Sequence, residues 1–248
     1  MQSNYLSKGL SELLFSLKNK IKCISLGIDD IFNPETDDLI YKKYSVDNLL
    51  DKIFCKIELQ KSLNLPIHTE IPIIVIPSIY MTDDEIILIN SIIPYTMRME
   101  IQIIIIGNKL SDFENNINKL SLGINCSIIS VDFNIENLRK VFSGSDIFLD
   151  ISPTGSNEYL LKIALKYGLI PIVLKEYDYL NIGDNRFRIF NFTTEDLINT
   201  IKYTINKYYY FSKWNEMVKN VMKLDYSWLN TTSSYMNLYK SIYDKVYN

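Results

Sequence analysis

The stretch Ile71–Leu88, IPIIVIPSIYMTDDEIIL, decides the fold of this chain. It begins with a short run of β-branched residues, Ile73–Ile76. It continues into Thr82-Asp83-Asp84-Glu85, where a potential N-cap residue is followed by acids that suit the first turn of a helix. The apolar run does not alternate with polar residues, which is typical of a strand covered by helices on both faces. The stretch therefore predicts one strand-to-helix unit of an α/β protein.

The same succession of short apolar runs and longer helical patterns continues toward the C-terminus. The other predicted strands are Gln102–Ile106, Ser127–Val131, Asp146–Leu149, Ile170–Leu174 and a shorter Arg188–Phe190. Helix starts are predicted at Ser111, at Asn134 as the cap of Ile135–Phe142 with Gly144 as its stop, and at Ser156 or Asn157 with Gly168 as the stop after Tyr167. Strands that alternate with helices pair in parallel, so the pattern predicts a Rossmann-like, doubly wound parallel sheet.

Further helices are predicted on both sides of this unit. Ser45–Leu63 is expected to form a single helix, with an apolar stripe of Leu49, Leu50, Ile53, Ile57 and Leu63. The C-terminal helices are predicted at Thr194–Tyr210, Ser212–Lys223 and Ser227–Val246. The last of them has large side chains at helical spacing, which we interpret as core filler rather than as a ligand site: Trp228, Tyr235, Tyr239, Ile242 and Val246.

Composition narrows the class of protein. The 248 residues are 47% apolar and 22% charged, with a net charge of -3, as in an ordinary globular protein. The 26 basic residues are dispersed, so we expect neither a nucleic-acid nor a membrane partner. The three cysteines, Cys23, Cys55 and Cys126, lie far apart in apolar surroundings that suit buried thiols. Without a signal-type or membrane-spanning apolar run, the chain is expected in the cytoplasm.

Four separated stretches, in the same order, resemble the C-terminal half of bacterial glycogen and starch synthases, which have the GT-B architecture of two facing Rossmann-like domains. The stretches are Ile24–Tyr44 (ISLGIDDIFNPETDDLIYKKY), Asp51–Leu65 (DKIFCKIELQKSLNL), Arg139–Ser152 (RKVFSGSDIFLDIS) with Ala164–Val173 (ALKYGLIPIV), and Leu224–Tyr239 (LDYSWLNTTSSYMNLY). The similarity runs from about Lys8 to Tyr243. It implies an interdomain-type segment and lead helix in 1–65, and a nucleotide-sugar-binding-type domain with C-terminal helices in 66–248.

The resemblance also shows which charged residues this chain lacks. In the family, an Arg and a Lys follow the first strand and neutralise the leaving diphosphate. In IPSIYMTDDEIIL, Ser78 stands at the position of the Arg, and Asp83 or Asp84 at that of the Lys. Exchanging cations for neutral and acidic groups turns attraction for a diphosphate into repulsion. We therefore predict no catalytic residues in this chain.

A second family signature, Ser-x-x-Glu-Pro-Cys-Gly-Leu-Thr, is also altered. Aligned with SPTGSNEYL, it begins at Ser152 and places Gly155 at the Glu, Asn157 at the Cys and Glu158 at the Gly. A helix N-terminus there can still offer amides to an anion. However, Glu158 in its first turn is better explained as a helix-start acid than as a sugar-binding carboxylate.

Two positions keep a residual binding character. Phe133 lies where the family tends to have a Tyr that packs against the nucleobase, although a strand-end Phe that covers the core is an equal alternative. Gly107 ends its strand as in a nucleotide site, but turn glycines are common there. His68, the single histidine, is expected to be a solvent-exposed linker residue, and neither a metal nor a cofactor is predicted.

Two functions remain open on this basis. In the first, the chain is a pseudo-glycosyltransferase that binds a partner, a glucan or a nucleotide. In the second, it is the donor-side component of a split glucosyltransferase that uses ADP- or UDP-glucose. Segments matching Tyr5–Leu17 and Ser227–Val246 cross the interdomain junction in the family, so exposed apolar stripes are expected here, with a homo-oligomer or a separate synthase N-terminal domain as the partner.

Overall fold

A computed structural model describes residues 11–17, 20–22, 24–107, 126–153, 155–174 and 180–247. In this part of the chain, six strands form one parallel sheet in the order β3-β2-β1-β4-β5-β6. Their bounds are β1 Ile73–Pro77, β2 Ile101–Gly107, β3 Cys126–Asp132, β4 Ile147–Asp150, β5 Ile170–Leu174 and β6 Phe187–Ile189. This strand order is that of a doubly wound Rossmann-like sheet, so the predicted fold class is confirmed.

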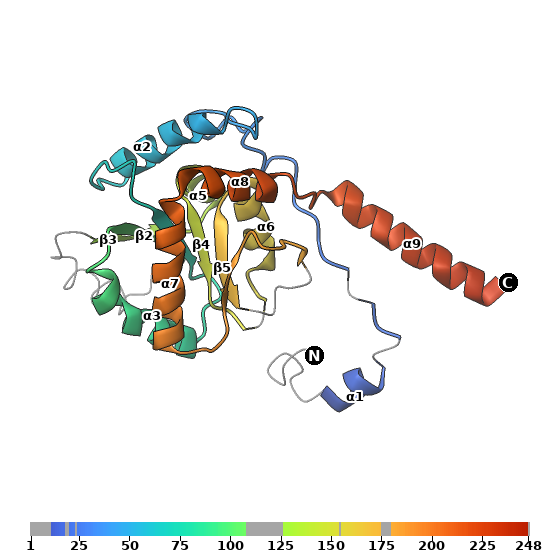
Figure 1. Ribbon diagram of the computed structural model, residues 1–248. Coiled ribbons are helices and arrows are strands. Elements are labelled where there is room, and N and C mark those ends of the chain that lie inside the picture. The colour runs from blue at the N-terminus through green and yellow to red at the C-terminus, as the bar shows by residue number, and fades with distance from the viewer. Residues whose placement is uncertain are drawn as a thin grey trace.

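Helices lie on both faces of the sheet (Figure 1). They are α3 Asp83–Thr96, α5 Ile135–Gly144, α6 Glu158–Lys166, α7 Thr194–Tyr208 and α8 Phe211–Met222. The remaining helices are α1 Ser11–Ser16, α2 Lys52–Ser62, which packs against α5, and α9 Trp228–Tyr247. The central strands are buried throughout, and Ile73–Ile76 are at most 1% exposed. The prediction that apolar runs indicate two-sided cover is therefore confirmed. The helix predicted from Ser111 lies outside the described residues.

Local signals place most helix ends within two residues of their predicted positions. Thr82 caps α3 with a capping box, because its hydroxyl accepts from the Glu85 amide while the Glu85 carboxylate accepts from the Thr82 amide. Asn134 caps α5, its Oδ1 lying 2.8 Å from the Asn137 amide nitrogen. Gly168, just after α6, has a φ of +76°, a backbone conformation that favours glycine and stops a helix.

The predicted lead helix is wrong in its start and in its buried face. The 3-10 turn Leu49–Asp51 precedes α2, because Asn48 Oδ1 accepts from the amide and hydroxyl of Ser45 and holds these residues in a local turn. Leu50, assigned to the apolar stripe, is 70% exposed. The buried face of α2 consists of Cys55, Lys56, Leu59 and Gln60. Two of these are polar, so an apolar stripe could not reveal them.

The core stripe predicted for the last helix is also wrong. Trp228, Tyr239 and Ile242 are 44%, 61% and 50% exposed, and α9 extends away from the body of the molecule (Figure 1). Its start is held by the bridge between Ile28 and Ser227 and by a 3.0 Å hydrogen bond from Trp228 Nε1 to Asp29 Oδ1. The helix itself forms as predicted, but its apolar side chains are not buried. Burial needs an opposing surface, and the described part of the chain does not provide one for α9.

Two smaller predictions can be compared with the structure. Cys55 is a buried free thiol, as predicted for the cysteines, whereas Cys23 lies outside the described residues. Among the described helices, none has the length and apolar character needed to cross a bilayer.

Candidate functional site

The candidate site lies along the carboxyl edge of the sheet, where the ends of β3, β2, β1 and β4 are neighbours. Ligands of open α/β sheets bind in the crevice outside this edge, where the strand order reverses. The residues singled out from the sequence are all at this edge. Gly107 ends β2 and Phe133 follows β3. Ser152, Gly155 and Asn157 belong to the turn between β4 and α6, and Glu158 is the first residue of α6.

Gly107 and Phe133 lie side by side at the ends of their strands. The Phe133 amide donates to the Gly107 carbonyl at 3.1 Å, and the Phe133 side chain is 40% exposed. A strand-end Phe that covers the core would be buried, so the exposure leaves this ring with a face for stacking. On the other side of β2, a Cβ at Gly107 would lie 2.0 Å from Ser78 Oγ. Ser78 therefore packs directly on Gly107, and any side chain at 107 would displace it.

The N-terminus of α3, which follows β1, is occupied by acids. Asp83, Asp84 and Glu85 form its first turn, and Asp83 and Asp84 are exposed. Glu85 is 2% exposed and its carboxylate is held by the Thr82 amide and hydroxyl. Carboxylates in the first turn stabilise a helix because they face the positive end of its dipole. A diphosphate at this helix N-terminus would be repelled by the same charges.

The turn between β4 and α6 is organised around a residue that sequence reasoning missed. Asp150 is 2% exposed, and its Oδ1 accepts from the Ser152 amide at 3.0 Å and from Asn157 Nδ2 at 2.9 Å. The hydroxyls of Ser152 and Ser156 lie 2.9 Å apart, and Gly155 has a φ of +69°. The sequence signal that could have revealed this residue is an acid at the end of an apolar strand, followed by an Asn before the next helix. It places one more negative group at this edge.

Glu158 begins α6 and faces the N-terminal segment rather than open space. Its carboxylate forms a 2.6 Å ion pair with Lys162 and accepts from the Ser25 hydroxyl. Lys162, whose side chain is 2% exposed, also donates to Ser25 Oγ and to the Leu26 carbonyl. The position in the first turn of α6 agrees with the prediction of a helix-start acid. Since Lys162 uses its charge on Glu158 and its donors on the N-terminal segment, it is not placed to bind a ligand anion.

The charge of the edge is therefore negative in the part that the structure describes. The segments 77–85, 132–137, 150–153 and 155–158 contain acids but no Lys or Arg. The loops 108–125 and 175–179, which include Lys109, Lys119 and Lys175, lie outside the described residues. The described groups offer hydrogen bonds, helix amides and one aromatic face. They offer no cation for a developing phosphate charge.

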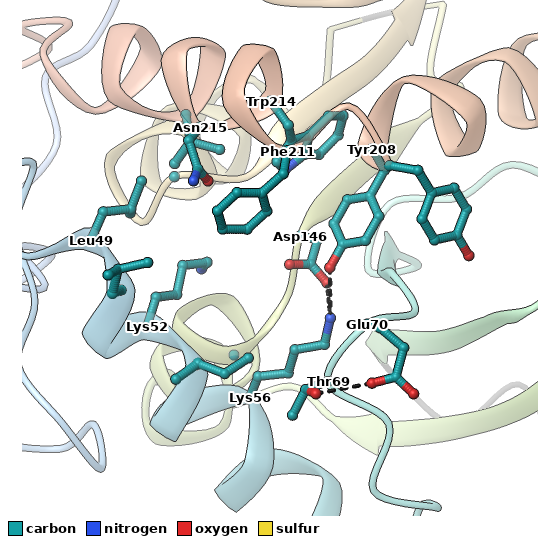
Figure 2. A pocket seen from close by; sticks show the side chains of 16 residues that line it. Leu49, Lys52, Lys56, Thr69, Glu70, Asp146, Tyr208, Phe211, Trp214 and Asn215 are labelled. Atoms are coloured by element: carbon teal, nitrogen blue, oxygen red, sulfur yellow. Dashed lines mark hydrogen bonds and ion pairs between the residues drawn. The ribbon is translucent and has the colours of Figure 1, made fainter.

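Two further lysines, Lys52 and Lys56, lie at the opposite, amino edge of the sheet and line a cavity of about 490 Å³ (Figure 2). Lys56, with a 3% exposed side chain, pairs with Asp146 at 2.7 Å and donates to the Ile71 carbonyl and the Tyr208 hydroxyl. Asp146 also accepts from the Ile73 amide at 2.9 Å, which ties α2 to the start of β1.

Lys52 donates to carbonyls at the C-terminal ends of two helices. Its Nζ lies 3.0 Å from the Ser143 carbonyl oxygen of α5 and 2.9 Å from that of Tyr167, the C-cap of α6. Helix C-termini attract cations because their last carbonyls are unpaired. Burial lowers the pKa of Lys52 from 10.5 to about 8, and nearby Asp146 opposes this change.

Two remaining predictions concern histidine and metals. His68 is exposed in the connector before β1, as predicted, with Nδ1 3.6 Å from Glu70. Within the described ranges, no group of three His, Cys, Asp or Glu side chains is arranged to hold a metal ion.

Comparison with known proteins identifies the relatives of this chain, although no protein-family model matches it. It is 31% identical to a glycogen synthase of Clostridium botulinum (strain Alaska E43 / Type E3), over 94% of this chain and 51% of that protein. It is also 31% identical to a glycogen synthase of Bacillus anthracis, over 98% of this chain and 53% of that protein. The chain thus spans about half the length of the curated relatives it matches.

Solved structures agree on the fold. The catalytic domain of starch synthase IV from Arabidopsis thaliana, bound to ADP and acarbose, superposes with a TM-score of 0.81 at 21% identity, over 97% of this chain and 52% of that one. At this identity the likeness concerns the fold alone. Together, these findings make the chain a homologue of glycogen synthases that covers about half of their length and has the Rossmann-like fold of a GT-B glycosyltransferase domain.

Proposed function

We propose that this chain is the C-terminal, donor-side half of a glycogen- or starch-synthase-like protein and does not transfer glucose by itself. It acts instead as a pseudo-glycosyltransferase in the cytoplasm, by binding a partner, a glucan or a nucleotide. The observation that carries this proposal is the charge of the carboxyl edge. The resemblance puts Ser78 at the family's Arg and Asp83 or Asp84 at its Lys, and Asp150 adds a buried acid. Each inverted charge weakens binding of a diphosphate by about 1 kcal/mol or more in a partly shielded crevice.

Residual binding would use the groups that survive at this edge. Phe133 offers a ring face to a base, and its amide is hydrogen-bonded to the Gly107 carbonyl at the end of the neighbouring strand. Ser152 and Gly155 lie in the turn before α6, and Asn157 and Glu158 begin this helix, whose N-terminal amides would face a phosphate or a sugar hydroxyl. The proposed role of all six residues is positioning and weak binding, not catalysis.

An assay of glucosyl transfer tests the proposal. The purified chain is incubated with ADP-glucose or UDP-glucose and glycogen, and incorporation of labelled glucose into polymer is measured. We expect none above background. Turnover by the chain alone would refute the proposal.

The alternative, a donor-side component of a split glucosyltransferase, is favoured by one specific observation. The chain spans about half of its relatives, and α9 exposes Trp228, Leu229, Met236 and Tyr243 along a helix that stands off the body (Figure 1). Such a surface suits a sister domain. Adding the separately produced N-terminal half of a relative, such as the Bacillus anthracis glycogen synthase, would then restore transfer in the same assay.

The same exposed helix suggests how the chain is organised. We propose that 1–65 is an interdomain-type segment packed on the domain 66–248, and that α9 covers a partner surface, either a second copy or a synthase N-terminal domain. Sedimentation is expected to show a species larger than the 29.0 kDa chain, or a shift to one when an N-terminal half is added. A compact monomer that is indifferent to added N-terminal half would contradict this.

A further inference from the structure

The cavity at the amino edge is separate from the candidate donor site, because it lies beside the residues that precede β1, β4 and β5. Thr69 and Glu70 come before β1, Asp146 comes just before β4, and Gly168 comes shortly before β5. Its volume of about 490 Å³ is in the range of small-ligand sites. It opens between the 3-10 turn Leu49–Asp51 with α2 on one side and the end of α7 with α8 on the other (Figure 2).

The floor of the cavity contains two lysines, Lys52 and Lys56, whose N–H groups already have acceptors within the protein. Lys56 donates its three N–H groups to Asp146, the Ile71 carbonyl and the Tyr208 hydroxyl, at 2.6 to 3.0 Å. Lys52 donates its N–H groups to backbone carbonyls. An anion would find no free donor on these lysines, and a cation would meet two like charges. The floor therefore selects for a neutral ligand.

The walls present apolar surface to solvent. Phe211 points into the cavity between Leu49 and Tyr208 (Figure 2) and is 65% exposed, while Leu50 on the opposite wall is 70% exposed. Trp214 closes the inner wall and is 4% exposed. A ligand with an apolar ring face would cover these exposed aromatic and aliphatic side chains and displace water from them, which favours binding.

The mouth adds hydrogen-bonding groups with free capacity. Glu70 accepts from Thr69 Oγ1 at 3.0 Å and lies 3.6 Å from His68 Nδ1, and hydrogen bonds from its own backbone and from Thr69 lower its pKa. Since its side chain is 69% exposed, this carboxylate can accept further hydrogen bonds. Asn215 makes no side-chain hydrogen bond with any described residue, which leaves its amide with both donor and acceptor capacity. A purely apolar ligand would leave these groups without partners at the rim.

From this combination we propose that the amino-edge cavity binds a neutral sugar or short neutral oligosaccharide, with a ring face on Phe211 and hydroxyls on Glu70 and Asn215. A sugar ring is neutral, has C–H faces for aromatic stacking and carries hydroxyls that both donate and accept. The site would hold a polymer on the opposite edge of the sheet from the donor crevice. Only the choice of an α-glucan as the probe rests on the proposed function.

Tryptophan fluorescence tests this site directly. The chain has two tryptophans, and Trp228→Phe on α9 leaves Trp214 in the cavity wall as a single reporter. In this background, maltotriose is expected to shift Trp214 emission with a millimolar Kd. Phe211→Ala is expected to weaken binding about tenfold, because it removes the stacking face. Asn215→Ala is expected to weaken it about threefold.

A control variant separates binding in this cavity from binding elsewhere on the surface. Phe190→Ala removes another exposed phenyl ring, at 63% exposure, outside this cavity, and is expected to leave maltotriose binding unchanged. No response up to about 50 mM, which would saturate a millimolar site, would overturn the proposal. So would binding unaffected by Phe211→Ala, or binding of cyclohexanol but not of maltotriose. The result is independent of the transfer assay, since that assay reports on the carboxyl edge.

Discussion

The two edges of the parallel sheet use charge in opposite ways. At the amino edge, Lys52 and Lys56 are buried with carbonyls and Asp146, and every N–H they carry has a partner. At the carboxyl edge, acids occupy the described helix starts, and Ser78 packs on Gly107. The amino edge is held together by a buried ion pair, whereas the described segments of the carboxyl edge contain acids but no Lys or Arg. The residues that hold the amino edge together are therefore different from those that set the charge of the carboxyl edge.

The largest expected effect comes from breaking the buried pair at the amino edge. Asp146→Ala leaves the Lys56 cation and the Ile73 amide without their acceptor in a buried position, so the free energy of unfolding is expected to fall by about 3–5 kcal/mol. Urea denaturation measures it. Asp38→Ala, which removes an exposed partner of Lys43, is the matched control and is expected to leave the urea midpoint unchanged. If the two variants lowered the free energy of unfolding equally, the buried ion pair at the amino edge would not contribute more to stability than an exposed pair.

A smaller effect comes from the pH dependence of Lys52. Burial lowers the pKa of this lysine from 10.5 to about 8, so between these values the unfolded chain binds more protons than the folded one. Stability from this group therefore rises with pH, by about 2 kcal/mol from pH 7.5 to 9.5. We expect the difference between the unfolding free energies of wild type and Lys52→Met to grow in favour of wild type over this range. A difference that is flat with pH would mean that the lysine is not desolvated.

The third effect concerns the carboxyl edge. Asp84→Lys restores a cation near the position where the family has one, and it is expected to raise the affinity for ADP at low salt about fivefold, or about 1 kcal/mol. Asp47→Lys makes the same charge change near the opposite edge, at another exposed acid, and is expected to leave ADP affinity unchanged. If both variants gain equally, net charge rather than the local charge of the crevice governs binding.

The sequence predicted elements well where local signals and burial agree. The β5 strand has its predicted bounds, and the Thr82 and Asn134 caps begin their helices as expected. The buried face of α2 could not be predicted, because Lys56 and Gln60 are buried through partners that are distant in sequence, Asp146 and Gln102. The exposure of α9 could not be predicted either, because a helical stripe does not say which surface covers it.

In the candidate site, too, the features that depend on local pattern could be predicted, and the contacts between distant residues could not. The position of Gly107 next to Phe133 follows from parallel pairing of consecutive strands, which the pattern predicts. The bond of Asp150 to Asn157 joins a strand end to a helix start, and the pairing of Glu158 with Ser25 spans most of the chain. Contacts of this kind depend on side-chain directions in space, which neither spacing nor composition provides.

The most direct test of the account is calorimetric titration of the chain with ADP-glucose and UDP-glucose, with the Bacillus anthracis glycogen synthase as the reference protein. Since the described segments of the carboxyl edge contain no Lys or Arg, we expect no binding tighter than about 1 mM, because the diphosphate gains no charge partner there. Micromolar binding of either donor would contradict the account, since it would require cations at that edge that restore the lost attraction.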